Sequence, residues 1–136
     1  MIVIDASALA KYVLAEEGWE EVKALLAEGA VSVDHVVKEV ANALWRKARV
    51  LKLEDEGVAR RRLRLLSRLI EGGVVKLVSE LDYVDRAFEI ALEHGVTVYD
   101  ALYIALALEE GLPLVTCDER QYKASRSLGV EALLIR

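Results

Sequence analysis

The sequence predicts a single α/β domain, residues 1–136, in which helices cover both faces of a central, mostly parallel sheet. Short apolar runs rich in β-branched residues alternate with longer segments in which apolar residues recur at the helical period. Strands separated by helices in this way form parallel sheets with right-handed crossovers. The length of 136 residues is enough for one hydrophobic core. We therefore expect three layers, α/β/α.

The first strand is expected at residues 2–4, a β-branched run that stops where Asp5 can begin a helix. A helix over residues 17–27 follows, because its apolar residues keep the helical spacing until Gly29 interrupts them. The β-branched run at residues 30–33 is the second strand.

Two longer helices are expected next. Residues 34–48 carry apolar side chains at every third or fourth position, and Asp34 can cap this helix. Residues 53–70 show the same periodicity and end at Gly72-Gly73. Residues 74–78 form a further extended segment.

The last third of the chain contains an amphipathic helix, a very apolar helix and two strands. The amphipathic helix covers residues 81–94 and ends at Gly95, and the apolar helix covers residues 99–110. Apolar runs at residues 114–116 and 130–135 are expected as the final strands.

Composition excludes several classes of protein. With 54% hydrophobic and 30% charged residues and one proline, the chain is neither disordered nor of low complexity. Its apolar stretches, such as residues 101–108, fall far short of the roughly 20 residues of a membrane-spanning helix. A single cysteine, Cys117, permits neither an internal disulfide nor a cysteine-rich zinc site. No secretory signal is visible, so we expect a cytoplasmic protein without membrane contact.

Positive charge is concentrated in one segment of an otherwise acidic chain. The chain has 18 Lys and Arg against 23 Asp and Glu, a net charge of −5. Residues 46–68 nevertheless carry nine basic and three acidic side chains, which is half of all the positive charge. This segment is either a solvated helix face or an arm that contacts phosphates.

Four acidic residues stand at the ends of expected core elements. Asp5 and Asp118 come directly after apolar strands, at the sheet edge where open α/β folds bind ligands. Glu39 lies just over one turn into the helix after the second strand, and Asp100 opens the most apolar helix. Asp5, Asp100 and Asp118 could each be a helix N-cap, and Glu39 could be a solvated helix residue. Their combination favours one shared acidic site.

Several carboxylates in one place repel each other unless their pKa values rise or cations bind. No Lys or Arg is adjacent in sequence to Asp5, Asp100 or Asp118. Mg²⁺ or Mn²⁺ is the expected counter-ion, because these hard ions prefer oxygen ligands and leave positions for substrate phosphate. Ser7 and Thr116 each lie two residues from a candidate aspartate, where they could orient the carboxylates or cap nearby backbone groups.

Four segments of the chain carry a family resemblance: Ile4 to Ser7, Glu39 to Leu44, Tyr99 to Ala107, and Leu114 to Asp118. Together they resemble the PIN-domain family over essentially the whole chain. Their order and spacing, and the length of the chain, are similar to those of the single-domain VapC-type toxins of prokaryotic toxin–antitoxin pairs. The resemblance implies a PIN-like three-layer α/β/α fold and a metal-dependent endoribonuclease.

The resemblance also implies residue roles and partners. The catalytic, metal-binding quartet would be Asp5, Glu39, Asp100 and Asp118, with Thr116 as the small hydroxyl residue near the last aspartate. We hypothesise that the three aspartates hold the principal Mg²⁺ or Mn²⁺ ion while Glu39 assists at a second ion or a water. Water would then attack the RNA phosphodiester in line, leaving a 3′-hydroxyl and a 5′-phosphate. The implied partners are a second copy in a homodimer and a cognate VapB-type antitoxin that blocks the acidic site.

The basic segment would then contact RNA phosphates through Lys47, Arg49, Lys52, Arg60, Arg61, Arg62 and Arg64. The roles of two residues stay open: Asn42 is a surface residue or part of the site, and Glu119 joins the metal ligands or caps a helix. A dimer surface could be supplied by Tyr12, Trp19, Trp45 and the Val36-Val37 face, although each could equally belong to the core.

Other acidic-edge folds fit less well. A phospho-receiver domain would have two adjacent acids after the first strand, and this chain has Asp5-Ala6-Ser7. A haloacid-dehalogenase-like phosphatase would need a second acid where Ser7 stands. The remaining alternative is a non-catalytic RNA- or protein-binding domain of the same fold, in which the acids only cap helices.

Overall fold

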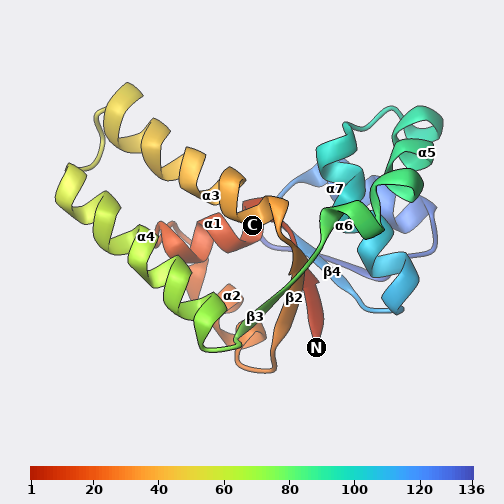
Figure 1. Cartoon of the computed structure of the whole chain (residues 1–136), viewed down its shortest axis with the longest axis horizontal. Coiled ribbons are helices and arrows are strands. Elements are labelled where there is room, and N and C mark those ends of the chain that lie inside the picture. The colour runs from red at the N-terminus through yellow and green to blue at the C-terminus, as the bar shows by residue number, and fades with distance from the viewer.

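The computed structural model describes all residues, 1–136, and places a five-stranded sheet between two groups of helices (Figure 1). Along the chain the elements are β1 (Ile2–Ile4), α1 (Ala6–Val13), α2 (Trp19–Leu26), β2 (Ala30–Val33), α3 (His35–Trp45), a π-helical turn (Arg46–Val50), α4 (Glu56–Glu71), β3 (Val75–Val78), a 3₁₀ turn (Glu80–Asp82), α5 (Val84–His94), α6 (Val98–Glu110), β4 (Leu114–Thr116), α7 (Glu119–Ser127) and β5 (Ala132–Leu134).

The sheet is entirely parallel, in the order β3-β2-β1-β4-β5. In the centre Val3 of β1 is in register with Val31 of β2 on one side and with Leu114 of β4 on the other. Successive strands extend the sheet from β1 to β3 in one direction, and the chain then returns to add β4 and β5 on the other side of β1. The boundary between β1 and β4 is therefore the topological switch point, where open α/β folds place their ligands.

The helices form two layers, one from the first half of the chain and one from the second half (Figure 1). Helices α1 to α4 pack on one another on one side of the sheet, and α5 and α6 pack together on the other side (Figure 1). Helix α7 packs against β4 and β5. This arrangement confirms the predicted three-layer α/β/α architecture with a parallel sheet.

The core lies where the central strands meet α6. Every residue of β1 and β4 is buried, which explains why their sequences are continuous apolar runs rather than alternating ones. Helix α6 buries seven consecutive residues, Ala101 to Ala107, because it is covered on all sides. Asp5, directly after β1, and Asp100, directly before the buried part of α6, therefore lie at the edge of the hydrophobic core.

Helices α3 and α4 and the turn between them project from the body as a helical hairpin, which we call the arm (residues 35–71; Figure 1). Helix α4 buries only Leu66, so most of its surface is solvated. Leu63, one of the periodic apolar residues of the helix predicted over residues 53–70, is 42% exposed, because the outer part of the arm has little protein to pack against. Trp45, which could have belonged to a dimer surface or to the core, is 55% exposed and therefore lies outside the core.

Several predicted boundaries were shifted. Helix α4 begins at Glu56 rather than residue 53, because the carboxylate of Asp55 accepts a hydrogen bond from the Gly57 amide at 2.9 Å and caps the helix there. Helix α5 begins at Val84 rather than residue 81, because a 3₁₀ turn capped by Ser79 comes first. The helix expected over residues 34–48 ends its α-helical part at Trp45 and continues as the π-helical turn.

Two further points differ from the sequence analysis. Helix α7 was not assigned from the sequence, because only Gln121 and Ser125 are buried in it and both are polar, so no apolar periodicity marks it. Asp34 stands at the N-terminus of α3 but does not cap it; its carboxylate instead accepts a hydrogen bond from the Glu80 amide at 3.1 Å.

None of the helices alone has the length and apolar character needed to cross a membrane; α5 and α6 reach them only as a pair, bent by 114°.

Candidate active site

The structure brings the four predicted carboxylates together around one cavity of about 260 Å³ at the topological switch point. Asp5 follows β1, Asp118 follows β4, Asp100 stands in the first turn of α6, and Glu39 comes from α3. The cavity is lined by Asp5, Ala6, Ser7, Ala10, Glu39, Ala43, Asp100, Tyr103 and Asp118. Glu119 is absent from this lining: it is the exposed first residue of α7, 3.7 Å from Lys123.

Asp5 is the most enclosed of the four, with 4% of the residue exposed. Its Oδ1 accepts hydrogen bonds from the Ser7 hydroxyl at 2.7 Å and from the Ala8 amide at 3.0 Å, so it also caps α1. Burial raises the pKa of Asp5 to about 6, and the negative charge of Asp100 adds to the rise. All of its hydrogen-bond donors are uncharged, and none of them neutralises the carboxylate.

Two hydroxyl groups connect the ends of β1 and β4 beneath this carboxylate. Ser7 Oγ lies 3.3 Å from Thr116 Oγ1 and accepts a hydrogen bond from the Cys117 amide at 2.9 Å. Thr116 Oγ1 in turn accepts one from the Asp118 amide at 3.0 Å. Ser7 thus contacts the Asp5 carboxylate and the backbone of Cys117, and Thr116 contacts the backbone of Asp118.

Asp118 is exposed and caps α7, accepting hydrogen bonds at Oδ1 from the amides of Arg120 at 2.8 Å and Gln121 at 3.4 Å. The side chain of Gln121 is 1% exposed and donates to the carbonyl oxygen of Asp100 at 3.0 Å. Gln121 therefore joins the start of α7 to the start of α6. It was missed in the sequence, because the helix that carries it has no apolar stripe.

Glu39 is held by two residues that the sequence analysis did not single out. The Tyr103 hydroxyl donates to Glu39 Oε1 at 2.6 Å, and His35 Nε2 lies 3.2 Å from the same oxygen. Tyr103 is 1% exposed, and both burial and the adjacent Glu39 carboxylate raise its pKa far above the ordinary value. Tyr103 stands one helical turn after Asp100, on the same face of α6.

Asp100 is only partly enclosed, and its carboxylate is close to others. Burial raises the pKa of Asp100, and the charges of Asp118 and Glu39 raise it further. The alternative weighed from sequence, that Asp100 is only an N-cap, is wrong: Thr97 caps α6, accepting a hydrogen bond from the Asp100 amide at 3.2 Å. The Asp100 side chain is therefore not needed to begin the helix.

No Lys or Arg forms an ion pair with the four carboxylates of the site, although the charge of Arg120 partly offsets the rise in the pKa of Asp100. Among the ion pairs of the chain, only the one with His35 involves any of the four carboxylates. An all-oxygen donor set with uncompensated charge suits a hard divalent ion. As the side chains stand, no group of three or more His, Cys, Asp or Glu could hold a metal ion by itself. Mg²⁺ is commonly bound through one or two carboxylates plus water, and this cavity supplies the carboxylates.

The predicted phosphate-contacting residues all lie on the arm, but two of them are engaged within the chain. Lys47 Nζ lies 3.0 Å from Glu54 Oε2, and Arg62 donates to Glu54 Oε1. Arg62 Nη1 also donates to the Val13 carbonyl at 3.0 Å, which fastens the arm to α1. Burial alone would raise the pKa of Glu54, but these two cations lower it below its ordinary value. The exposed members of the set are Arg49, Lys52, Arg60, Arg61 and Arg64.

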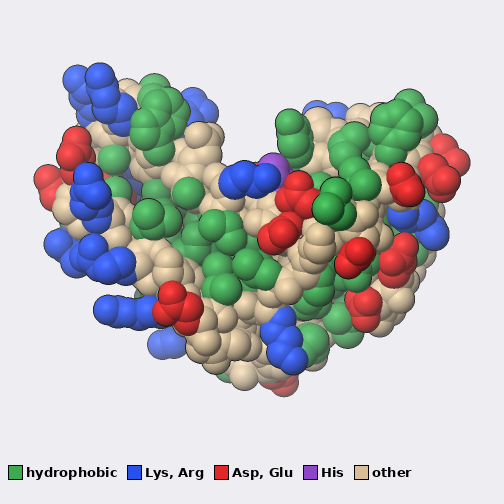
Figure 2. Space-filling model, in the orientation of Figure 1, with side chains coloured by type: hydrophobic (Ala, Val, Ile, Leu, Met, Phe, Trp, Pro, Cys, Tyr) green, Lys and Arg blue, Asp and Glu red, His purple; other side chains and the backbone are tan.

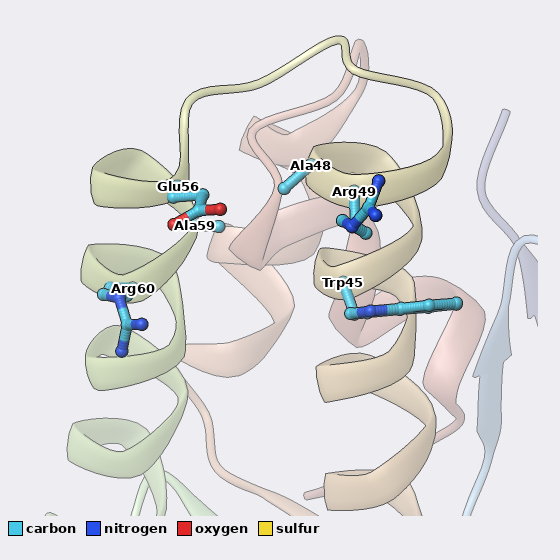
Figure 3. A pocket seen from close by; sticks show the side chains of 6 residues that line it. All are labelled: Trp45, Ala48, Arg49, Glu56, Ala59 and Arg60. Atoms are coloured by element: carbon cyan, nitrogen blue, oxygen red, sulfur yellow. The ribbon is translucent and has the colours of Figure 1, made fainter.

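Charge is segregated across the hollow face of the molecule. Figure 2 shows Lys and Arg side chains gathered mainly over the arm and Asp and Glu mainly over the α5–α6 side, with a hollow between them. A separate cavity of about 250 Å³ lies between the end of α3 and the start of α4 (Figure 3). Arg49 and Arg60 line it, whereas the indole ring of Trp45 points away from α4.

Comparison with known proteins identifies the family. The sequence model of the PIN domain matches residues 2–127. The chain belongs to the PIN-domain family. The predicted membership is thereby confirmed, and the relatives of this PIN domain carry VapC names, as the sequence resemblance implied.

Among the relatives, Ribonuclease VapC3 of Pyrobaculum aerophilum is 38% identical over 122 residues, covering 88% of this chain and 90% of that protein. Exonuclease VapC9 of the same organism is 32% identical over 136 residues, covering 98% and 93%. Among solved structures, PAE2754 from Pyrobaculum aerophilum matches with a TM-score of 0.71 at 26% identity, covering 96% of this chain and 87% of that one. VapC20 of Mycobacterium tuberculosis, described as a sarcin-ricin loop cleaving toxin, matches with the same TM-score at 20% identity, covering 91% and 95%.

Proposed function

We propose that this PIN domain is a Mg²⁺- or Mn²⁺-dependent endoribonuclease that acts in the cytoplasm as the toxin of a toxin–antitoxin pair. The observation that carries the proposal is the cavity in which Asp5, Glu39, Asp100 and Asp118 meet without a Lys or Arg partner. The names of the relatives support the same chemistry, because VapC3 is called a ribonuclease and VapC20 a cleaving toxin.

The residues of the cavity have distinct tasks in this proposal. A bound divalent ion would activate water and offset the charge of the phosphodiester. Asp5 and Asp118 would hold the ion, fixed through the Ser7 and Thr116 hydroxyls, and Asp100 would complete the negative cavity. Glu39, oriented by Tyr103, would hold a second ion or accept a proton from water. The attacking oxygen forms the new bond to phosphorus as the bond to the ribose 3′-oxygen breaks, giving a 3′-hydroxyl and a 5′-phosphate.

The direct test is cleavage of defined RNAs in Mg²⁺, Mn²⁺ or EDTA by the wild type and Asp118→Asn. Cleavage that needs the ion and is lost in Asp118→Asn supports the proposal. Glu119→Gln is the matched control, because this neighbouring acid lies outside the cavity lining and should leave cleavage unchanged. RNA binding that is indifferent to metal and produces no cleavage would support the non-catalytic alternative.

A separate substrate is needed to distinguish cleavage within the RNA from cleavage at its ends, because one relative is named an exonuclease. A circular RNA has no ends, so only an endonuclease can convert it to a linear product. Linear product from the wild type, absent in EDTA, supports the endonuclease; degradation of linear RNA with intact circles would replace it with an exonuclease.

The arm is proposed to hold RNA phosphates through its exposed cations. Replacing Arg60, Arg61 and Arg64 by Glu should weaken RNA binding and flatten its dependence on salt, because fewer counter-ions are released. An unchanged affinity and salt slope would leave the arm as solvated surface.

The proposed homodimer and the VapB-type antitoxin require apolar surface. Val36, considered for a dimer face, is fully buried in the core. Instead, Phe88 and Leu92, which are one turn apart on one side of α5, are exposed by 55% and 72%, and Leu81 in the preceding 3₁₀ turn is exposed by 78%. We therefore place the dimer contact on α5, and we propose that the antitoxin covers the hollow that contains the acidic cavity.

A further inference from the structure

A second cavity, of about 370 Å³, adjoins the acidic one and has no role in the proposed cleavage step. It is lined by His35, Lys38, Glu39, Asn42 and Tyr99. Glu39 lines both cavities, so the second one lies directly beside the carboxylates. The α3 residues at this cavity recur every three or four positions and form one face of the helix. Tyr99, from the first turn of α6, forms the opposite wall.

The aromatic part of this cavity is a stacked pair with an open side. The rings of His35 and Tyr99 lie 4.9 Å apart at an interplanar angle of 14°. The His35 side chain is only 12% exposed, whereas Tyr99 is 60% exposed. His35 therefore covers one face of the tyrosine and fixes its orientation, while the rest of the phenol ring stays accessible. A supported, exposed aromatic ring is the platform on which unpaired nucleobases stack.

The polar part of the cavity suits a nucleotide as well. The side chain of Asn42 is exposed and can both donate and accept hydrogen bonds, as the edge of a base requires. Lys38 is 68% exposed and lies 3.7 Å from Glu80, so its charge stays largely available to a phosphate.

We propose that this cavity binds the base of a nucleotide next to the phosphodiester that is cut, with the base stacked on Tyr99 and its edge on Asn42. This inference rests on the proposed nuclease function. A protein side chain is a poorer occupant, because Tyr99 is the only hydrophobic residue in the lining.

The test combines changes in the protein with changes in the RNA. The cut is first mapped in a defined single-stranded RNA, and abasic nucleotides are then placed at each position on either side of it. Affinity is measured by fluorescence anisotropy in Mn²⁺, with Asp118→Asn as the uncleaving background, for Tyr99, Tyr99→Ala and Tyr99→Phe. Tyr122→Ala is the matched control, because Tyr122 is a partly exposed tyrosine that lines neither cavity.

With Tyr99 or Tyr99→Phe, an abasic nucleotide at one position should weaken RNA binding by roughly tenfold. Tyr99→Ala should bind the intact RNA roughly tenfold more weakly, and the same abasic nucleotide should then cause no further loss. Asn42→Ala should reduce the discrimination between bases at that same position while leaving the abasic RNA unaffected. If the penalties of Tyr99→Ala and of every abasic position simply add, or if Tyr99→Ala binds intact RNA normally, the inference is overturned.

The experiment distinguishes failure of the nuclease proposal from failure of the base-binding inference. In that case no RNA is cut by the wild type in either metal, and the abasic scan is run over every position of the RNA by binding alone. Coupling between Tyr99 and one position would then show a base-binding cavity in a non-cleaving protein, and its absence would overturn the inference.

Discussion

Asp5→Asn tests the electrostatic interpretation of the site through stability alone, without any assumption about RNA. Burial raises the pKa of Asp5 from 3.8 to about 6 in the folded protein. A carboxyl whose pKa is raised on folding stabilises the protein fully at pH values below its unfolded pKa, and this contribution is lost as the pH rises through the folded pKa. A difference of one in pKa corresponds to about 1.36 kcal/mol. Ionisation of Asp5 therefore lowers the free energy of unfolding of the metal-free protein by about 3 kcal/mol at pH 8 and by less than about 1 kcal/mol at pH 4.

Asparagine has the same shape, keeps an Oδ1 that accepts hydrogen bonds from Ser7 and Ala8, and carries no charge. In EDTA, the free energy of unfolding of Asp5→Asn relative to the wild type should therefore increase by about 2 to 3 kcal/mol between pH 4 and pH 8. Urea denaturation followed by circular dichroism measures this difference, and any pH-independent effect of the amide cancels in it.

Asp85→Asn, at an exposed position in the first turn of α5, is the matched control and should show no such increase. Addition of Mn²⁺ at pH 8 should then stabilise the wild type more than Asp5→Asn, since only the wild type gains a counter-ion for this carboxylate. A difference between Asp5→Asn and the wild type that is constant with pH would refute the claim that Asp5 is an uncompensated buried charge.

Three further changes probe the surroundings of the site. Tyr103→Phe removes the hydroxyl that holds Glu39 Oε1, so kcat should fall several-fold with little change in KM and about 1 kcal/mol of stability should be lost, while Tyr122→Phe should be neutral in the same assays. Glu54→Gln leaves Lys47 and Arg62 without their partner and should cost about 1 to 3 kcal/mol at neutral pH by urea denaturation. That cost should vanish as the pH falls through the lowered pKa of Glu54, because the wild type loses the same charge there, and Glu71→Gln at the exposed end of α4 should have none. Phe88→Glu on α5 should convert the proposed dimer to a monomer in sedimentation velocity, whereas Leu53→Glu on the arm should not; an unchanged sedimentation coefficient would move the contact elsewhere.

The sequence predicted the parts of this structure that depend on local pattern. Strands β1, β2 and β4 lie where their apolar runs begin and end, since a buried parallel strand needs a continuous apolar sequence. The meeting of Asp5 and Asp118 was predictable for a related reason, because residues that follow parallel strands lie at the same edge of the sheet.

What could not be predicted depends on contacts between distant residues. Tyr103 and Glu39 are 64 positions apart in the chain, and no local sequence pattern predicts the hydrogen bond between them. The ion pairs of Glu54 with Lys47 and Arg62 could not be predicted either. A run of charged residues has the same sequence pattern whether its members pair with each other or bind a ligand. Gln121 is buried and polar in a helix with no apolar stripe, so neither its helix nor its contact with Asp100 was visible.

The kind of donor that the fold gives each acid explains why the cavity stays negative. Asp5 is held by a serine hydroxyl and a backbone amide, Asp118 by two backbone amides, and Glu39 by a tyrosine hydroxyl and a histidine ring. Such donors fix the position of a carboxylate and keep it anionic, whereas a Lys or Arg would fix it and cancel its charge. The chain does use cations to hold an acid, but it does so at Glu54, in the connection before α4, and Glu54 does not line the acidic cavity. Because no Lys or Arg pairs with its acids, the cavity has the negative charge that the proposed divalent ion needs, and the arm offers the positive surface that the proposed RNA substrate needs.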